Sequence, residues 1–343
     1  MITPLVSPVR DWDRLGRTWR ALEGRVDLSF FQSWSWVGCL ASERYDDPWV
    51  VEARAKEETV GLALFNRHTG WHGSRFALHE SGDPAFDTPF IEHNGFVGPH
   101  AREAFGAVLG GLWPRRLRLS GVDGATLAAA RKAAPWVHLR QSRDAPFADL
   151  TRDFLAGRSA NTRQQLRRSD RAYGRVAVER ASSIAQAHAH LDEMALLHQA
   201  SWRARGQAGS FAAPFFDRFH RALIEEALPR GEIDLLRVVA EGHTIGVLYN
   251  FRFRGRALAY QSGFDYGAAD GPRKPGLTCH HAAIGLSAAA GLHTYDFLAG
   301  DARYKRSLSD GSVRLHWAEA GSWMDLPLAF RYAASRWRGR PDG

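Results

Sequence analysis

An acidic residue interrupts an apolar segment close to the end of the sequence. Residues 293–311 read HTYDFLAGDARYKRSLSDG, and Asp296 lies inside a run that predicts a buried strand over residues 293–298. A surface loop explains the charges that follow, but it does not explain a carboxylate in the middle of that strand. Such a carboxylate either transfers protons in a reaction or fixes a turn through an ion pair, for example with Lys305. The residues alone leave both interpretations open.

The segment GPRKPGLT, residues 271–278, has the features of a phosphate-binding turn. A strand ends near residue 264, a loop with glycine and proline follows, and a helix of small residues begins near Pro275. Free N–H groups and the dipole at a helix start attract phosphate, and a glycine there lets a ligand approach the backbone. An ordinary capped helix with an exposed basic turn has the same residues, and the segment by itself favours that simpler interpretation. The residues predicted to hold phosphate are Arg273, Lys274, Gly276, Leu277 and Thr278.

The preceding strand, AYQSGFD at residues 259–265, has a glycine near its end. Gly263 in that position indicates a β-bulge or the close approach of another backbone. A bulged strand beside a phosphate-binding helix can place a free N–H against a thioester carbonyl and so stabilise an oxyanion. We therefore expect Tyr260 and Gln261 to belong to the site. The simpler alternative is a strand that ends at a glycine.

Two further groups of residues are candidates for contacts with a substrate. Arg163, Arg167 and Arg171 recur at intervals of four, so they share one face of a helix that could meet a phosphorylated ligand or tRNA. Trp202, near the end of a long predicted helix, could stack on a substrate. Charged helix faces are more often only solvated, and a tryptophan is as often a packing residue.

Composition and charge limit the classes of function. The 343 residues carry a formal net charge of +8, with 45% hydrophobic and 24% charged residues, which is typical of a packed protein that binds acidic partners. The two cysteines form no CxxC pair, no apolar run has the ~18–20 residues of a membrane span, and the N-terminus lacks a signal-peptide core. A cytoplasmic protein without membrane spans is expected. Adjacent His280 and His281 cannot share a helix face, so no metal is expected, and there is no G-x-S-x-G nucleophile elbow.

Strand-like and helical patterns alternate along the chain, which predicts an α/β or α+β fold. Three antiparallel strands are expected at residues 233–240, 244–253 and 256–264. Shifting the sequence by 185 residues aligns VVEARAKEETVGLAL with LLRVVAEGHTIGVLY without a gap, with T-[VI]-G at the same place in each. A duplicated unit is the simplest account of this similarity. The expected units are residues 1–150 and residues 151–343.

The C-terminal half also contains motifs of a known family. LHQASWRARGQAGSF, HTIGVLYNFRFRGRALAYQSGFD and PGLTCHHAAIGLSAAAGLHTYDFLAGDARYK occur in the order and with the spacing found in one branch of the GNAT acetyltransferase superfamily. This part of the chain, about residues 190–310, resembles the CelD-like or FemAB-like branch. The N-terminal half is similar only through FFQSWSW and the hairpin at residues 50–66.

The resemblance implies two GNAT-like units in tandem, each a mixed, mostly antiparallel sheet flanked by helices, with the active site in the C-terminal unit. It also implies transfer of an acyl group from acyl-CoA, such as acetyl-CoA, to an amine of a small molecule or amino sugar, in envelope polysaccharide metabolism. FemAB-type relatives take an aminoacyl group from tRNA instead, so tRNA is a second candidate partner. GPRKPGLT replaces the usual Q/R-x-x-G-x-G/A pyrophosphate loop, which leaves a non-catalytic GNAT-like binding protein as a third interpretation.

The resemblance also suggests roles for the residues of the opening segment. Asp296 would face the cleft and accept a proton from the attacking amine. Tyr304 and Lys305 would face the same cleft, with the lysine beside a phosphate or carboxylate of the acceptor. A backbone N–H near Gln261 would stabilise the oxyanion, and Tyr260 or Tyr304 would protonate the leaving thiolate.

Overall fold

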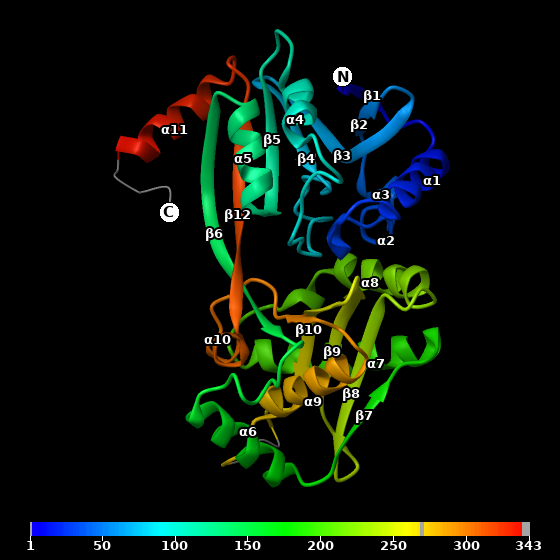
Figure 1. Ribbon diagram of the computed structural model, residues 1–343, viewed down its shortest axis with the longest axis vertical. Coiled ribbons are helices and arrows are strands. Elements are labelled where there is room, and N and C mark those ends of the chain that lie inside the picture. The colour runs from blue at the N-terminus through cyan, green and yellow to red at the C-terminus, as the bar shows by residue number, and fades with distance from the viewer. Residues whose placement is uncertain (1, 268–270, 338–343) are drawn as a thin grey trace. The chain divides into compact units, whose positions relative to one another are not determined.

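The chain divides into two units. The computed structural model describes residues 2–267 and 271–337, and Figure 1 traces the chain. Unit 1 comprises Met1–Arg143 and Arg314–Gly343, and unit 2 comprises Asp144–Val313. The division expected at residue 150 differs from these units mainly in the last strand and helix, which join unit 1 although they follow unit 2 in the chain.

The sheet of unit 1 is antiparallel except for one parallel pair. The first four strands in sheet order are antiparallel neighbours, and the fourth and fifth are parallel. The last strand of the chain then pairs antiparallel with the fifth through residues 316–321. In sheet order the strands are β1 (Ile2–Pro8), β2 (Pro48–Ala55), β3 (Glu58–Gly70), β4 (Gly73–Leu78), β5 (Arg115–Val122) and β12 (Gly311–Gly321).

Helices bury the apolar side chains of this sheet. Two of them begin at an aspartate that accepts a hydrogen bond from the first turn: Asp11 from the N–H of Arg14, and Asp123 from that of Thr126. Phe105 is fully buried in the main core of the unit. The helices are α1 (Trp12–Glu23), α2 (Trp34–Val37), α3 (Ala41–Arg44), α4 (Ala101–Leu109), α5 (Gly124–Ala133) and α11 (Leu326–Trp337).

Unit 2 has a sheet of the same design. Its first four strands are antiparallel neighbours, the fourth and fifth are parallel, and the sixth is the end of a strand that starts in unit 1. In sheet order they are β7 (Val176–Arg180), β8 (Ile233–Ala240), β9 (His243–Phe253), β10 (Arg256–Phe264), β11 (Thr294–Asp296) and β6 (Trp136–Asp149). The three antiparallel strands expected from the sequence are confirmed as β8, β9 and β10.

Helices cover both faces of the unit 2 sheet. In Figure 1, α9 crosses one face of β8 to β10, and α7 lies behind the same strands. The helix α6 packs against α9. The helices of this unit are α6 (Ala160–Tyr173), α7 (Ile184–Arg203), α8 (Pro214–Ala227), α9 (Pro275–Ala289) and α10 (Arg303–Leu308).

The register of the strands confirms the duplication that the sequence suggests. A shift of 185 residues carries the bounds of β2 onto those of β8. Both hairpins have a register shift in the same place, after Ala53 in one and after Val238 in the other. The equivalent turn residues Lys56 and Glu241 both have left-handed backbone, with φ of 56° and 50°. A bulge and a turn conserved in position indicate two copies of one unit.

Candidate active site

Two parallel strands of unit 2 separate after a short pairing. Residues 256–258 of β10 pair with residues 294–296 of β11. β10 then continues beside β9 to Phe264, whereas β11 ends at Asp296. The part of β10 beyond Leu258 is therefore no longer paired with β11. We call this point the strand divergence of unit 2.

A β-bulge lies just beyond the strand divergence. The pairing of β10 with β9 skips one residue between Ala259 and Gln261, so Tyr260 is the extra residue. The Tyr260 ring stacks at 6.4 Å on Phe216 of α8, and Gln261 Nε2 donates a hydrogen bond to Ser210 Oγ at 3.2 Å. Two successive side chains thus turn to the α8 side, as a bulge requires. The expected bulge is present, three residues before the glycine that suggested it.

The first turn of α9 offers one free backbone donor. The N–H groups of Leu277 and Thr278 donate to the carbonyl oxygen of Lys274, at 3.0 and 3.1 Å. Pro275 has no N–H, so Gly276 carries the first-turn N–H for which the described residues supply no acceptor. This N–H and the helix dipole can bind an anion.

The two cations predicted to bind phosphate make contacts within the chain. Arg273 Nε donates to the carbonyl oxygen of Ala172 at 3.2 Å, and its guanidinium lies 3.8 Å from the Glu241 carboxylate. Lys274 Nζ donates to Gln165 Oε1 at 3.0 Å. Both side chains therefore fasten the start of α9 to its surroundings, and a bound phosphate would have to compete with these partners.

Thr278 and Leu277, also predicted beside phosphate, face the interior of unit 2. Thr278 is buried, and its hydroxyl is 2.9 Å from Ser169 Oγ and donates to Asp170 Oδ1 at 2.9 Å. Leu277 packs against the hydrophobic core. These contacts join α9 to α6 and fix the position of the free N–H of Gly276.

A buried histidine of α9 contacts the ends of both separating strands. The His280 ring lies 5.8 Å from the Phe264 ring at the end of β10 and 5.6 Å from Phe297, just after β11. Its Nδ1 shares a hydrogen bond with the Tyr295 hydroxyl at 3.0 Å, and its buried Nε2 has no partner among the described residues. Burial lowers the pKa of His280 to about 3, so the ring is neutral at pH 7. Its free nitrogen can form one hydrogen bond to a ligand.

Asp296 fixes the turn at which β11 ends. Its buried carboxylate accepts a hydrogen bond from the N–H of Leu298 at 2.7 Å, and Leu298 has left-handed backbone with a φ of 58°. Lys305 Nζ donates to the carbonyl oxygens of Leu298 and Ala299, at 3.1 and 3.0 Å. Both charged residues therefore stabilise the turn, and the proton transfer predicted for Asp296 remains a proposal.

The two tyrosines expected to protonate the thiolate lie on different sides of the sheet. Tyr260 contacts α8, whereas the Tyr304 ring stacks on His280 of α9 at 5.1 Å. Burial raises the pKa of the Tyr304 hydroxyl. A hydroxyl of raised pKa stays protonated and donates a hydrogen bond more readily than a proton.

A second buried histidine lies on the α7 side of the bulged strand. A Cβ on Gly263 would be 2.4 Å from the carbonyl oxygen of Met194, so only glycine lets α7 approach so closely. Trp202, predicted to meet substrate, stacks on His198 at 5.6 Å. Both ring nitrogens of His198 are buried without a partner among the described residues, and burial lowers its pKa to about 4. Trp202 thus packs on the neutral ring of His198, whose two nitrogens form no hydrogen bond with the described residues.

The predicted arginine stripe on α6 is partly used inside the unit. Arg163 is half-buried, and its Nη1 donates to the carbonyl oxygen of Arg158 at 2.6 Å. Further along and just beyond α6 the basic side chains are exposed; they are Arg167, Arg168, Arg171 and Arg175. α6 therefore presents a basic surface to solvent.

In unit 1 the chain itself occupies the equivalent position. Residues 74–77 of β4 pair in parallel with residues 115–118 of β5, as in unit 2. Beyond them, the backbone N–H of Asn94 donates to the carbonyl oxygen of Gly121 at 3.0 Å. The side-chain amide of Asn94 donates to the carbonyl oxygen of Leu78, also at 3.0 Å. The pairing of β4 with β3 has no bulge. Among the described residues of unit 1, β4 thus has neither the bulge nor the unpaired edge that β10 has in unit 2.

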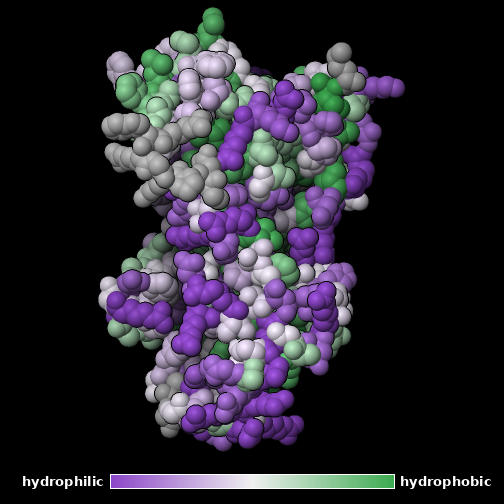
Figure 2. Space-filling view, turned by 60° about the vertical axis from the view of Figure 1, so that its left-hand side comes forward, coloured by the Kyte–Doolittle hydropathy of each residue, from purple (hydrophilic) through white to green (hydrophobic). Residues whose placement is uncertain are grey.

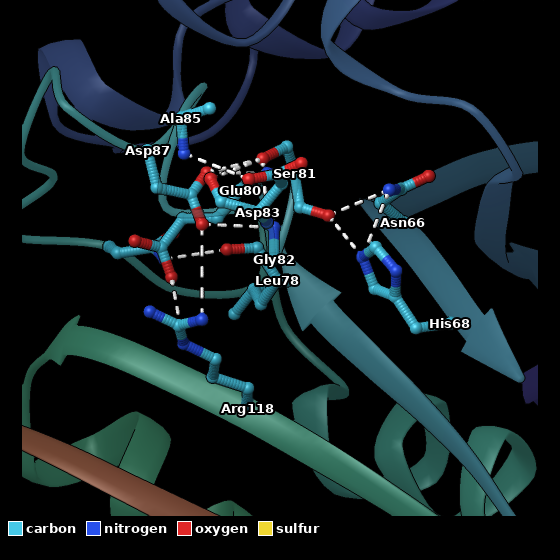
Figure 3. Close-up of polar contacts among 11 residues, drawn as sticks. Asn66, His68, Leu78, Glu80, Ser81, Gly82, Asp83, Ala85, Asp87 and Arg118 are labelled. Atoms are coloured by element: carbon cyan, nitrogen blue, oxygen red, sulfur yellow. Dashed lines mark hydrogen bonds and ion pairs between the residues drawn. The ribbon is translucent and has the colours of Figure 1, made fainter. Parts of the chain in front are cut away.

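A buried ion cluster fixes the loop that leaves β4 in unit 1 (Figure 3). Asp87 accepts hydrogen bonds from the N–H groups of Ser81 and Gly82, at 2.8 and 2.9 Å. Arg118 of β5 lies 3.8 Å from Glu80 and 3.9 Å from Asp87. Burial raises the pKa of Glu80 to about 7, and the charge of Asp87 adds to the shift. Since Asp87 bonds the turn itself, the cluster holds the loop in place.

Sequence reasoning missed both buried histidines as candidate site residues. His280 drew attention only as a neighbour of His281, and His198 only as part of a motif. The available signal was helical spacing, because residues four apart share a helix face. His198 precedes Trp202 by four residues, and His280 follows Gly276 by four. Their missing partners become visible only in the folded chain.

The described residues form neither a metal-binding cluster nor a membrane-spanning helix. Across residues 2–267 and 271–337, no group of histidine, cysteine and acidic side chains is arranged to hold a metal ion. No helix in this part of the chain is both long and apolar enough to cross a membrane.

Comparisons with known proteins agree with this architecture. A family model described as an acetyltransferase (GNAT) domain matches residues 160–306. No curated protein matches the sequence. The fold of FemX is similar, with a TM-score of 0.64 and 10% identity over 95% of this chain and 99% of that one.

Two further solved structures share the fold. The C-terminal domain of a predicted lysylphosphatidylglycerol synthetase from Agrobacterium fabrum has a TM-score of 0.58 and 11% identity, over 94% of this chain and 96% of that one. A protein of unknown function from Bacteroides thetaiotaomicron has a TM-score of 0.59 and 9% identity, over 93% and 100%. The matched domain contains the strand divergence, the bulge and α9. Residues 160–306 therefore match an acetyltransferase (GNAT) domain that lies within unit 2, and the chain shares the fold of these solved structures.

Proposed function

We propose that unit 2 transfers an acyl group from a thioester to an amine at its strand divergence. The observation that supports this is a combination of three features. They are the separation of two parallel strands, the bulge at Tyr260 and the free N–H of Gly276. An unpaired strand edge can hydrogen-bond an extended ligand, and a helix start favours its phosphates. Unit 1 has its own chain at the equivalent edge, so we propose that it serves as a scaffold.

The donor that suits this arrangement is an acyl-CoA such as acetyl-CoA. Coenzyme A carries its thioester on an arm with amide groups and ends in phosphates, which matches a strand edge followed by a helix start. The acceptor we propose is a small amine or amino sugar of envelope polysaccharide metabolism, and no metal takes part. We place the reaction in the cytoplasm, where thioester donors are made.

Aminoacyl-tRNA is the second candidate donor, and one observation favours it. The exposed arginines on and just beyond α6, among them Arg167 and Arg171, form a basic surface within the unit that would carry the reaction. Such a surface binds nucleic acid with an affinity that falls steeply with salt. The name of one structural neighbour, a predicted lysylphosphatidylglycerol synthetase, also indicates transfer of an amino acid.

The chemistry requires one bond to form and one to break. The amine nitrogen attacks the thioester carbonyl carbon, the C–N bond forms, and the C–S bond then breaks. The amine loses one proton, which we assign to the Asp296 carboxylate or to a water that it holds. The thiolate leaves and takes up one proton from solvent, while a backbone N–H near the bulge stabilises the oxyanion.

The neutral rings beside the strand divergence have a different role in this scheme. The pKa of His280 is about 3 and that of His198 about 4, so neither holds a proton at neutral pH. They are too weakly basic to deprotonate an amine, but each can position one by a hydrogen bond. Tyr304 donates a hydrogen bond to the departing sulfur.

The test is a transfer assay with acyl-CoAs and aminoacyl-tRNA as alternative donors and a panel of amines and amino sugars as acceptors. We expect release of free thiol that depends on the acceptor. Asp296→Asn keeps an oxygen for the N–H of Leu298 but cannot take a proton, so it should lower kcat about 100-fold with KM unchanged. Asp301→Asn, in the exposed loop nearby, is the matched control and should stay active.

Two outcomes would change the proposal. Release of tRNA but not of thiol would replace acyl-CoA by the second candidate donor. An Asp296→Asn variant as active as the Asp301→Asn control would remove Asp296 from proton transfer and leave it only its place in the turn.

A further inference from the structure

Large apolar side chains are unusually exposed at one end of unit 1. Trp71 is 98% exposed, Leu112 is 95% exposed and Phe330 is 81% exposed. Figure 2 shows green, hydrophobic side chains scattered among pale and purple ones in the upper part of the view. We name this surface the apolar rim, and it consists of Trp71, Leu112, Trp113, Trp323, Leu326 and Phe330.

Three segments far apart in the sequence bring the apolar rim together. The hairpin between β3 and β4, which carries Trp71, is joined to the loop before β5 by the hydrogen bond from Ser74 N to the Pro114 carbonyl oxygen, at 2.9 Å. The end of β12 is joined to the same place, because Ser322 N donates to the carbonyl oxygen of Arg115 at 2.9 Å. The six side chains therefore belong to two neighbouring turns and to the segment that ends β12 and begins α11.

The helix α11 adds a short apolar face to the rim. Leu326 and Phe330 are four residues apart, so they lie on the same side of the helix. Leu328, between them in the sequence, is fully buried and fastens the helix to unit 1. The exposed pair is thus a surface feature of a docked helix rather than part of the core.

Basic groups are interleaved with the apolar rim. A groove of about 410 Å³ lies beside Trp71 and is lined also by Arg75, Arg115 and Arg331. Of the described residues that line it, Asp325 alone is acidic, and its carboxylate already accepts hydrogen bonds from Arg116, at 2.6 and 2.7 Å. Arg331 itself donates to the Glu319 carboxylate at 3.1 Å. The surface therefore combines exposed aromatic rings with the positive charges of Arg75 and Arg115.

We propose that the apolar rim docks unit 1 onto a membrane surface rich in anionic lipid. Aromatic and aliphatic side chains on separate turn tips can enter the boundary between headgroups and acyl chains without matching a partner's shape. The interleaved arginines then meet lipid phosphates, and the net charge of +8 attracts the whole protein to that surface. A protein partner would instead favour one flat, closely packed apolar face.

The test is co-sedimentation of the full protein with vesicles of phosphatidylcholine, with and without phosphatidylglycerol, at low and physiological ionic strength. We expect binding to the anionic vesicles that weakens with salt. Trp71→Ser and Phe330→Ser should each weaken it about tenfold, because each removes one aromatic ring that the membrane would bury. Leu196→Ser, at an apolar residue of α7 in unit 2 that is 74% exposed, is the control and should bind like the wild type.

Three results would overturn this proposal. They are the absence of binding to anionic vesicles at low salt, binding that the two rim variants do not weaken, and a wild-type dimer that the rim variants convert to a monomer. The last result would identify a second copy of the chain as the occupant. The experiment needs no substrate, so it does not depend on the reaction proposed for unit 2.

Discussion

Replacing Gly276 with valine is expected to weaken acetyl-CoA binding roughly thirtyfold while the protein stays folded. In the first turn of α9, the free N–H of Gly276 is the hydrogen-bonding group that a phosphate of acetyl-CoA can reach. A hydrogen bond to a charged group contributes about 2 kcal/mol, and every 1.4 kcal/mol is about tenfold in affinity. A branched side chain beside that N–H keeps the phosphate at a distance. Calorimetric titration of the purified variant measures the change.

The structure supplies matched controls for this substitution. A Cβ on Gly276 would lie 3.4 Å from the Phe264 ring and 3.6 Å from the Tyr266 hydroxyl, which are ordinary contacts, so Gly276→Ala should fold and bind almost normally. Gly285, in the same helix, has open space around it, and Gly285→Ala should leave binding unchanged. If Gly276→Val binds acetyl-CoA as tightly as Gly285→Ala, the donor phosphate does not use this helix start.

Replacing Asp310 with alanine is expected to lower the free energy of unfolding by about 3 kcal/mol. Asp310 forms an ion pair with Arg158, whose side chain is only 1% exposed, and it accepts a hydrogen bond from the N–H of Asp149 at 2.9 Å. Without its partner the buried guanidinium keeps its charge, which is the costly case. Urea unfolding followed by circular dichroism measures the loss.

A second variant separates the charge effect from simple loss of contacts. Arg158→Met combined with Asp310→Ala removes the buried charge as well, so it should recover part of the lost stability. Asp217→Ala breaks a partly exposed pair with Arg221 and should cost less than about 1 kcal/mol. A loss for Asp310→Ala no greater than for Asp217→Ala would show that the buried pair does not hold unit 2 together.

Local patterns predicted the parts of the fold that depend on neighbours in sequence. The strands β8, β9 and β10 follow from alternating side chains and from glycine turns such as Gly242 and Gly255. The start of α9 at Pro275 follows from the preference of proline for the first helical position. The duplication could be predicted from the sequence because the two hairpins still align without a gap.

Features that depend on distant residues could not be read from the sequence. The strand expected at residues 293–298 ends at Asp296, because that carboxylate bonds the N–H of Leu298 and turns the chain. β12 pairs with β5 in unit 1, a partner that no local pattern indicates. The contacts of Arg273 and Lys274 with α6 likewise arise only when α9 docks there.

The candidate site was therefore predicted in outline and not in detail. The bulge is present, although it lies three residues before the glycine that suggested it, and α9 begins at Pro275 as expected. The neutral histidines were missed, because burial sets their pKa values and burial is a property of the folded chain. Lys305, expected to face a ligand, instead bonds the carbonyl oxygens of the turn.

The measurement that tests the central claim most directly is photolabelling with an acyl-CoA that carries a diazirine in its acyl chain. After irradiation, mass spectrometry of the digested protein locates the label. Our account predicts labelling in unit 2, within residues 259–264 of β10 and residues 276–280 of α9, and its loss when excess acetyl-CoA is present. Labelling in unit 1 near Asn94, or no labelling that acetyl-CoA prevents, would contradict it.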